Sequence, residues 1–302
     1  MPKILRPERI HRKYIETYFP LQTDQFWREI SNLRKIHSRT PPEITKHIPD
    51  LAIPKPKLGG KNPNKENASD ANKSKASFSI ERIKGALQMN HSIYLLPDQI
   101  TRLKIFYEIG NILQGVYNHT GLIFTDINED NFLLRFSSSN HEPEIYIVDW
   151  ESARYQGEPI SFWLYRPYAH PEILKAIALN RTLEARPAID IHGLTMLMAE
   201  MLLNIDETFV TIPEREEISA TLTGLKRLKK VLIELGGRIF LTKSYKLLGK
   251  PSLSLEEVNQ LRLEIELLRF ILKYIRLPYD SPKYNWDDWL ADLDKIIKLA
   301  KN

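Results

Sequence analysis

The chain of 302 residues contains no cysteine. Disulfide bridges, thiolate zinc sites, iron–sulfur clusters and cysteine nucleophiles are therefore excluded. No apolar run approaches the ~20 residues that a helix needs to cross a bilayer. The basic N-terminal residues also lack the apolar core of a signal peptide. We therefore expect a cytoplasmic protein without a membrane span.

Several sequence signatures of catalysis are also missing. The sequence has no GxSxG elbow, no Walker A loop and no GxGxxG. The eight histidines show neither HxxxH nor HExxH spacing, so we do not expect a zinc site. With 42% hydrophobic and 27% charged residues, the composition is that of a globular protein, which excludes collagen-like and wholly disordered chains.

Charge is distributed unevenly along the chain, whose net charge is +5. Residues 1–84 hold 18 Lys and Arg against 9 Asp and Glu, whereas the remainder holds 25 against 29. A basic N-terminal part can meet the phosphates of a nucleotide or a nucleic acid, but a solvated basic face with a Lys-rich loop is the favoured explanation. No nucleic-acid-binding motif accompanies the charge, so a nucleic-acid partner is not expected.

Residues 55–76 stand apart because they are almost entirely Lys, Asn, Ser, Gly and Pro. Such a segment cannot bury enough apolar surface to order itself, so we expect a disordered loop. Before it, residues 24–37 place four large apolar side chains at helical spacing, which predicts a helix. After it, residues 78–83 alternate in the manner of a short strand.

The centre of the chain predicts one long helix and one hairpin. Residues 100–118 have apolar side chains at helical spacing, with Asp98 before them as a start signal and Gly121 after them as a stop signal. Residues 131–136 and 144–148 are short apolar runs that flank a polar tip, which is typical of a β-hairpin.

The C-terminal part has mainly helical periodicity. Residues 189–203 are apolar on nearly every side, which predicts a buried helix. Further helices are expected over residues 214–236, 254–276 and 286–300. The sequence therefore predicts an α+β chain with a small basic front, a central hairpin and a helical rear.

Three polar residues flank the predicted hairpin. Asp126 and Asn131 precede or begin the first strand, and Asp149 follows the second. Because a hairpin brings its outer ends together, we expect these side chains to converge. Their oxygens suit Mg²⁺, and a carboxylate that does not bind the metal can act as a base towards a hydroxyl. The alternative is that both aspartates only cap turns.

Four motifs around these residues resemble the protein-kinase-like superfamily. GLIFTDINEDNFLL is similar to the catalytic loop usually written GIIHRDLKPENILL, and IVDWESA stands in the place of Asp-Phe-Gly. YRPYAHPEIL resembles the Ala-Pro-Glu segment, and RPAIDIHGLTMLMAEML resembles the buried helix usually written SDVWSLGVVLYEML. The motifs occur in the order of the family and at nearly its spacing.

The resemblance implies roles for the residues that match. Asp126 would position and deprotonate the acceptor hydroxyl, while Asn131 and Asp149 would hold Mg²⁺. Asp190, on the buried helix, would accept hydrogen bonds from the backbone of the loop that precedes Asp126, which makes it structural. PKYNWDDWLADL resembles the closing helix of the family, where Lys283 would pair with the glutamate of the Pro-Glu segment, Glu172.

The similarity extends toward the N-terminus. FWREISNLRKIH resembles the regulatory helix of the N-lobe, which implies that Glu29 pairs with a phosphate-binding lysine, Lys3 in PKILRPE. Together they would hold the α- and β-phosphates of ATP. FSIERIKGAL resembles the strand and hinge that receive adenine, so that the backbone of Glu81 and Ile83 would bind the base and Ile80 would be the gatekeeper.

The sequence also departs from the family pattern. It has no glycine-rich phosphate loop, and the His and Arg of the catalytic loop are Phe124 and Thr125, which removes the usual anchor for an activation-loop phosphate. Asn128 replaces the lysine that normally stabilises the transferring phosphoryl group. The Phe and Gly of Asp-Phe-Gly are Trp150 and Glu151. Asp-Trp-Glu is frequent in the aminoglycoside and choline phosphotransferase branch, whereas the Pro-Glu segment favours the protein-kinase branch.

The resemblance implies a protein-kinase-like two-lobe fold, with a reduced N-lobe over residues 1–83 and a helical C-lobe over residues 84–302. The implied function is ATP- and Mg²⁺-dependent phosphoryl transfer to a Ser/Thr-type hydroxyl of a protein substrate. Two alternatives stay open. The missing glycine-rich loop and lysine favour a pseudokinase that serves as a binding or scaffold module, and Asp-Trp-Glu favours a small-molecule phosphotransferase.

Overall fold

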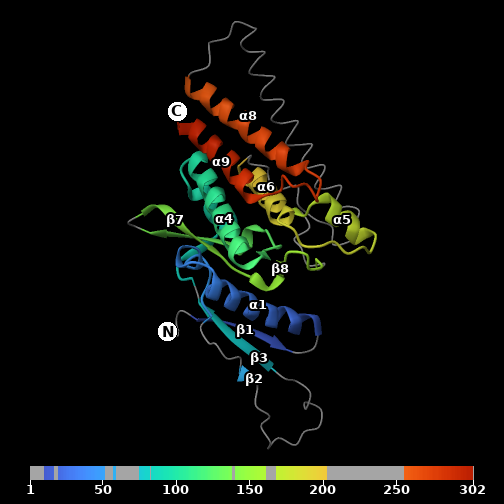
Figure 1. Ribbon diagram of the computed structural model, residues 1–302. Coiled ribbons are helices and arrows are strands. Elements are labelled where there is room, and N and C mark those ends of the chain that lie inside the picture. The colour runs from blue at the N-terminus through green and yellow to red at the C-terminus, as the bar shows by residue number, and fades with distance from the viewer. Residues whose placement is uncertain are drawn as a thin grey trace, which may run out of the picture.

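The computed structural model describes residues 10–16, 20–51, 57–58, 75–81, 83–137, 140–160, 168–202 and 255–301. Over these ranges the chain is α+β, with small antiparallel sheets and several long helices (Figure 1). None of the described helices combines the length and the apolar character that crossing a membrane requires. The predicted helix at 214–236 and the candidate Lys3 lie outside the described residues.

The N-terminal part is a small sheet packed against one helix. Strands β1 (Ile10–Glu16), β2 (Lys57–Leu58) and β3 (Lys75–Glu81) form an antiparallel sheet in the order β1-β3-β2. Helix α1 (Pro20–Arg39) contains the predicted helix and buries Ile30, Leu33 and Ile36 at the expected spacing. It lies between β1 and the rest of the molecule (Figure 1).

Two predictions for this part need correction. Residues 57–58 and 75–76, expected in a disordered loop, lie in strands β2 and β3. Lys57 pairs with Ser77 and Leu58 with Ala76, and Lys75 pairs with Glu16 of β1, because backbone hydrogen bonding does not require apolar side chains. The rest of that loop lies outside the described residues. Strand β3 also begins and ends earlier than the predicted strand at 78–83.

Helix α4 (Gln99–Thr120) runs through the core of the C-terminal part, as predicted. The carboxylate of Asp98 accepts a hydrogen bond from the backbone N–H of Thr101 at 2.7 Å, which satisfies one free donor of the first turn. At the other end, Gly121 has φ 73° and donates to the carbonyl of Tyr117 at 2.7 Å. This left-handed residue ends the helix and turns the chain toward the site.

The predicted hairpin is present as β6 (Phe132–Ser137) and β7 (Asn140–Ile147), with β4 (Ala86–Gln88) on the outer side of β6. Strand β7 begins earlier than expected and includes Pro143, because its partner β6 also extends to Ser137. A second short pair, β5 (Leu122–Ile123) with β8 (Arg154–Tyr155), lies beside the hairpin ends. Between β4 and α4 lie α3 (Met89–Ser92) and η2 (Ile93–Leu95).

A short segment after α1 ties the N-terminal part to the hairpin. It contains α2 (Pro42–Thr45) and then His47, which is buried. The carbonyl of His47 accepts from the backbone N–H of Ile147 at 2.9 Å, and its Nδ1 donates to the carbonyl of Ile145 at 2.8 Å. Burial holds the pKa of His47 below its usual value. These bonds fix α1 relative to β7.

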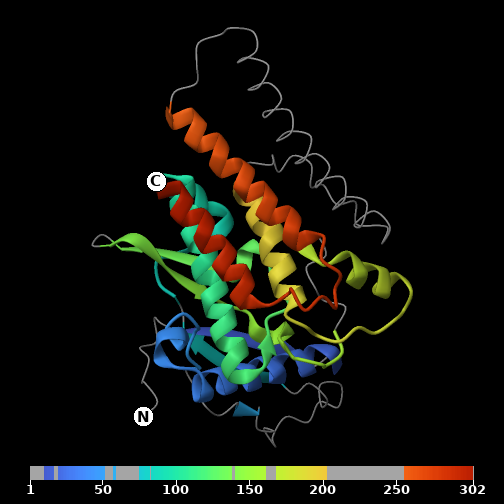
Figure 2. The same ribbon diagram turned by 45° about the horizontal axis from the view of Figure 1, so that its top comes forward.

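The C-terminal part is a bundle of helices. Besides α4 it contains α5 (Pro171–Ala178), α6 (Ala188–Leu202), α8 (Leu255–Ile275) and α9 (Trp286–Lys301) (Figure 2). Helix α6 is buried on nearly every side, as predicted.

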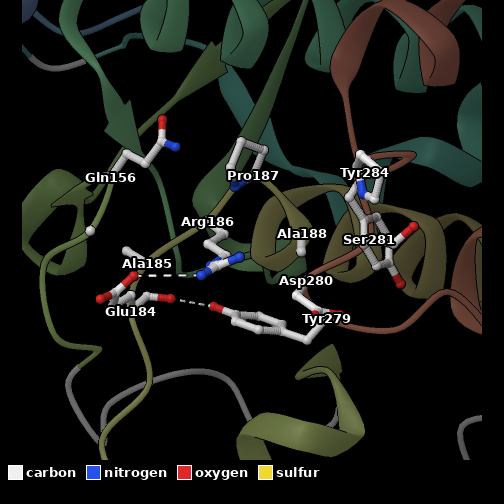
Figure 3. Close-up of a pocket in the computed structure, with 12 residues that line it drawn as sticks. Gln156, Glu184, Ala185, Arg186, Pro187, Ala188, Tyr279, Asp280, Ser281 and Tyr284 are labelled. Atoms are coloured by element: carbon white, nitrogen blue, oxygen red, sulfur yellow. Dashed lines mark hydrogen bonds and ion pairs between the residues drawn. The ribbon is translucent and has the colours of Figure 1, made fainter.

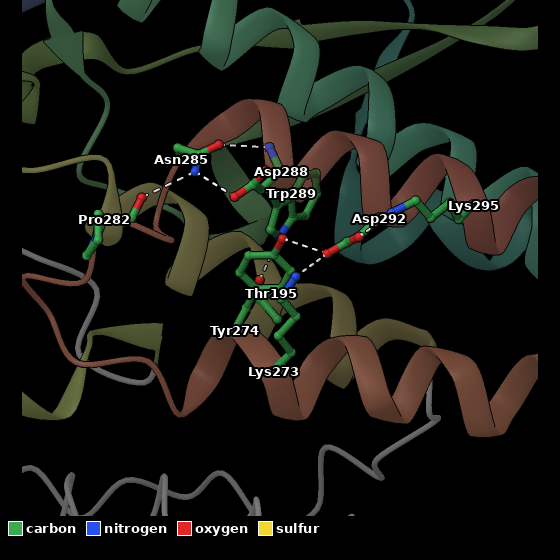
Figure 4. A network of polar contacts seen from close by, with 9 residues as sticks. All are labelled: Thr195, Lys273, Tyr274, Pro282, Asn285, Asp288, Trp289, Asp292 and Lys295. Atoms are coloured by element: carbon green, nitrogen blue, oxygen red, sulfur yellow. Dashed lines mark hydrogen bonds and ion pairs between the residues drawn. The ribbon is translucent and has the colours of Figure 1, made fainter.

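Polar contacts hold α9 to α6 and α8 (Figure 4). The indole N–H of Trp289 donates to the hydroxyl of Thr195 on α6 at 2.9 Å, inside the core. On the outer side, Asp292 accepts from the hydroxyl of Tyr274 on α8 at 3.0 Å and pairs with Lys273 and Lys295. The buried indole bond fixes the register of α9, because an unpaired buried N–H would be costly.

Candidate functional site

The loop that follows β5 and begins at Phe124 is bonded to Asp190 of helix α6. Both oxygens of the Asp190 carboxylate accept backbone hydrogen bonds, from Phe124 at 2.7 Å and from Thr125 at 2.8 Å. Asp190 is buried, and burial raises its pKa to about 7 although the two N–H donors oppose the shift. The predicted structural role of Asp190 as an anchor for this loop is confirmed.

Thr125 links this loop to the one that carries Asp149. Its backbone has φ 68°, a left-handed conformation that is uncommon for a β-branched residue. Its hydroxyl donates to the carbonyl of Ser152 at 2.8 Å, and the side chain is buried. The side chain of Thr125 therefore joins two neighbouring loops.

Asp126 and Asn131 meet as the sequence predicts. The Nδ2 of Asn131 lies 2.9 Å from Oδ2 of Asp126 and 2.9 Å from its carbonyl oxygen, and it donates to both. The turn that makes this possible is η3 (Glu129–Asn131), which follows directly from the loop. The amide of Asn131 thus fixes the orientation of the Asp126 carboxylate.

Asp149 lies at the end of the second hairpin strand, next to Asn131 in space. The backbone N–H of Val148 donates to the carbonyl of Asn131 at 3.0 Å, which continues the β6–β7 pairing to the residue before Asp149. Asp149 itself is left-handed, with φ 66° and ψ 58°, and turns the chain into η4 (Trp150–Ser152). The contact between Asp126 and Asn131 is therefore present, and the backbone pairing brings Asp149 to the same end of the hairpin. That the three side chains form one site stays a prediction.

Trp150 is a packing residue that anchors α1. Its ring is fully buried and meets Phe124 edge-on, with centroids 4.8 Å apart. Its indole N–H donates to the carbonyl of Ile147 at 3.1 Å, while its own carbonyl accepts from the side-chain amide of Asn32 on α1 at 2.8 Å. The rings of Phe124 and Trp150 therefore pack against each other next to α1.

Glu29 faces the site from α1. Carboxylate oxygens of Glu29, Asp149 and Glu151 all lie within 4.8 Å of one another, a spacing at which they could share a cation. Glu29 is buried, and Asp149 and Glu151 are half-buried. The sequence interpretation missed Glu151. The signal that Glu29 points inward is its place on the buried stripe of α1, four residues before Leu33.

Of the two residues proposed to bind adenine, Glu81 is the last residue of β3 and Ile83 lies two residues beyond it. Glu81 pairs with Ile10 across the sheet, and Ile80 pairs with His11. Ile83 is half-buried, and its carbonyl accepts from the backbone N–H of Ala86 at 3.5 Å, in the turn that leads into β4. The assignment of Glu81 and Ile83 to adenine stays a prediction.

Glu129, which the sequence does not mark as a site residue, also lies beside the loop that carries Asp126. The hydroxyl of Tyr168 donates to Oε2 of Glu129 at 3.3 Å. Burial raises the pKa of Glu129, and the nearby charges of Glu200 and Asp130 raise it further. The sequence signal for Glu129 is its place between Asp126 and Asn131, three residues after the first and two before the second.

The Pro-Glu segment is anchored differently from the prediction. Glu172 accepts a hydrogen bond from the backbone N–H of Tyr279 at 3.3 Å, in the position proposed for Lys283. The ion pairs of the described residues do not include Lys283 with Glu172, and the backbone N–H of Lys283 donates to the hydroxyl of Ser281. The preceding His170 accepts from the N–H of Glu172 through Nδ1, and its Nε2 donates to the carbonyl of Leu277 at 3.0 Å.

A hollow of about 560 Å³ opens between the start of α6 and the loop before α9 (Figure 3). Its walls include the rings of Tyr279 and Tyr284 and the guanidinium of Arg186, which pairs with Glu184 at 3.6 Å. The hydroxyl of Tyr279 donates to the carbonyl of Glu184 at 2.6 Å. The hollow includes none of the residues predicted for catalysis.

No protein-family model matches this sequence, and no curated protein matches it either.

Proposed function

We propose that the chain has a protein-kinase-like two-lobe fold and catalyses ATP- and Mg²⁺-dependent phosphoryl transfer to a hydroxyl of a protein substrate. The observation that carries this proposal is the hydrogen bond between Asn131 and Asp126 at the hairpin end that also carries Asp149. The alternative is that Asp126 only caps a turn, and such a cap would bond to backbone N–H groups. The carboxylate of Asp126 instead accepts from the side-chain amide of Asn131.

The proposed roles follow from chemistry and position. Asp126 would accept the proton of the substrate hydroxyl, with its carboxylate held in place by the amide of Asn131. Asn131 and Asp149 would hold Mg²⁺, and the oxygens present are of the hard type that this ion prefers. When bound, the ion would neutralise charge on the phosphates of ATP. Glu29, with a carboxylate oxygen within 4.8 Å of one of Asp149, would add a further negative charge to the site.

The rest of the nucleotide would be held by the N-terminal part. Glu29 with Lys3 would hold the α- and β-phosphates, and the backbone of Glu81 and Ile83 would bind adenine. The reduced N-lobe would span residues 1–83 and the helical C-lobe residues 84–302. The hydrogen bonds between His47 and β7 support this arrangement, because they would fix the position of α1 relative to the loop that carries Asp126.

A pseudokinase that serves as a binding module is the second candidate. It is favoured by Asn128, a neutral residue in the place of the catalytic lysine, whose side chain is engaged with its own loop. A small-molecule phosphotransferase is the third, favoured by Asp-Trp-Glu at 149–151. The three candidates differ in whether ATP binds and in which acceptor is modified.

Two measurements test the proposal. The first is thermal unfolding with ATP and Mg²⁺, since a ligand at 100 times its dissociation constant stabilises the folded chain by ~2.7 kcal/mol. The second is transfer of radiolabel from γ-labelled ATP to a mixture of proteins and, separately, to aminoglycosides and choline. Asp126→Asn keeps an acceptor for Asn131 but no base, so it should bind ATP and lose transfer. Asp280→Asn makes the same change on an exposed loop and should transfer normally.

Each outcome selects one candidate. Stabilisation by ATP with transfer to protein, lost in Asp126→Asn, supports the proposed function. Stabilisation without transfer to any acceptor supports the binding module. Transfer only to the small acceptors supports the small-molecule phosphotransferase. An unchanged melting temperature and no transfer would refute the proposal.

A further inference from the structure

Asn128 occupies the turn between Asp126 and Asn131, where the protein-kinase motif has a lysine. Its Oδ1 accepts hydrogen bonds from the backbone N–H groups of Asp130 at 3.0 Å and of Asn131 at 3.2 Å. Its Nδ2 donates to the carbonyl of Asp126 at 3.3 Å. Both ends of this half-buried side chain therefore bond to its own loop.

These bonds place Asn128 at the start of a chain of contacts that ends at Asp126. Asn128 is the N-cap of η3, and the last residue of η3 is Asn131. The side chain of Asn131 then donates to the carboxylate of Asp126 at 2.9 Å. Fixing the backbone at Asn131 therefore fixes the carboxylate that Asn131 orients.

We propose that Asn128 is a positioning residue that sets the Asp126–Asn131 pair, and that it does not replace the phosphate-binding cation of the motif. The inference rests on the proposed function for its catalytic consequence. A lysine at this position has three donors and no acceptor, so the N–H of Asp130 would lose its side-chain acceptor, and the N–H of Asn131 would keep only the backbone carbonyl of residue 128, at 3.3 Å. Position 128 can therefore hold either the lysine of the motif or the capping residue seen here, but one side chain cannot do both.

Four variants distinguish a capping role of residue 128 from a phosphate-binding role. Asn128→Ala removes the cap, and Asn128→Ser keeps an oxygen acceptor of comparable capping strength. Asn128→Lys restores the cation of the motif and loses the cap. Asp98→Ala removes an N-cap of the same kind from α4, away from the loop, and controls for a general loss of stability.

The first measurement is the affinity for ATP in Mg²⁺ divided by the affinity in EDTA, by calorimetry on the full chain. If Asn128 positions Asn131 as a metal ligand, this ratio falls about tenfold in Asn128→Ala, as expected for one lost cap. It falls similarly in Asn128→Lys, and it stays near the wild-type value in Asn128→Ser and Asp98→Ala. A ratio that is unchanged in Asn128→Ala, or ATP binding that is stronger in Asn128→Lys, would overturn the proposal.

The second measurement needs no nucleotide and separates this inference from the proposed function. Amide hydrogen exchange at Asp130 reports directly on its bond to the side chain of Asn128, whereas the N–H of Asn131 also donates to the backbone carbonyl of residue 128 at 3.3 Å. Exchange at Asp130 should be about tenfold faster in Asn128→Ala and in Asn128→Lys, with a smaller increase at Asn131, and close to wild type in Asn128→Ser and Asp98→Ala. If wild type binds no ATP but shows this pattern, the proposed function fails and the positioning role stands. Equal exchange in wild type and Asn128→Ala would refute the positioning role.

Discussion

The carboxylate of Asp190 accepts a hydrogen bond from the backbone N–H of Thr125 at 2.8 Å, although the two residues are 65 positions apart in the sequence. The other oxygen accepts from Phe124 at 2.7 Å. These bonds satisfy buried donors and hold Thr125 in its left-handed conformation. Helix α6 therefore fixes the backbone immediately before Asp126.

Replacing Asp190 by Asn should destabilise the chain nearly as much as replacing it by Ala. The amide keeps one oxygen for one N–H but turns its own donor toward the other, so one buried donor loses its acceptor. The expected loss in the free energy of unfolding is about 1–3 kcal/mol. Urea unfolding of both variants at neutral pH measures it. Wild-type stability in Asp190→Asn would mean that only one of the two bonds matters.

Much of this framework could be predicted from the sequence, because it is made by long periodic segments. The apolar spacing of residues 100–118 and 189–203 identifies α4 and α6, and the turn signals at Asp98 and Gly121 mark the ends of α4. The contact between Asp190 and the loop followed from the resemblance to the kinase motifs. Composition and spacing alone do not indicate it.

Other features could not be predicted, for reasons that are local. Strands of two or three residues, such as β2, β5 and β8, are too short to show alternation. The approach of Glu151 to Glu29 depends on how α1 docks on η4, which no pattern along the chain encodes. The replacement of an expected Lys283 contact by the N–H of Tyr279 depends on the path of a loop.

Asp149→Asn should remove Mg²⁺-dependent binding of ATP and leave the fold intact. Asn tolerates the left-handed backbone that Asp149 adopts, so the turn into η4 should be kept. It removes the only negative charge of the proposed Asn131–Asp149 ligand pair, which should weaken binding of a divalent cation. Thermal unfolding with ATP, with and without Mg²⁺, measures the effect, and Asp280→Asn is the matched control. A Mg²⁺-dependent shift equal to that of wild type would contradict the assignment of Asp149 to the metal.

His192 should make the chain less stable in acid. Burial and the neighbouring His170 lower the pKa of His192 from 6.5 to about 3, although its Nδ1 donates to the carbonyl of Tyr168. Between these values the unfolded chain binds more protons than the folded chain, so the free energy of unfolding falls as the pH falls. The contribution approaches 1.4 kcal/mol per pH unit.

The measurement compares wild type with His192→Asn, whose amide can donate to Tyr168, by urea unfolding at pH 7, 6, 5 and 4. The raised pKa of Asp190 acts in the opposite direction, since its contribution to stability falls as the pH rises toward 7. Asp190 is present in both proteins, so its effect cancels in the difference. Wild type should lose stability relative to the variant as the pH falls, and parallel curves would contradict the role of His192.

Gly193 lets helix α6 pack closely against the loop that carries Asp126 and Ile127. A Cβ at Gly193 would lie 3.0 Å from Cβ of Ile127, so Gly193→Ala should push Ile127, and with it the neighbouring Asp126, by a few tenths of an ångström. Gly110→Ala makes the same change in α4, where the new Cβ would lie 2.7 Å from the ring of Trp289, far from the loop in sequence.

Both glycine variants should lose a similar, modest amount of stability, because ~1 kcal/mol gained by Ala in a helix interior offsets part of the ~1–3 kcal/mol cost of overpacking. Only Gly193→Ala should lower phosphoryl transfer, by about tenfold per folded molecule, because a misplacement of ~1 Å near the reacting groups can cost 10²-fold. The assay is radiolabel transfer corrected for the folded fraction, with Gly110→Ala as the control. If both variants transfer equally well, the loop at Ile127 absorbs the added methyl group without moving Asp126, and close packing against α6 does not set the position of the proposed base.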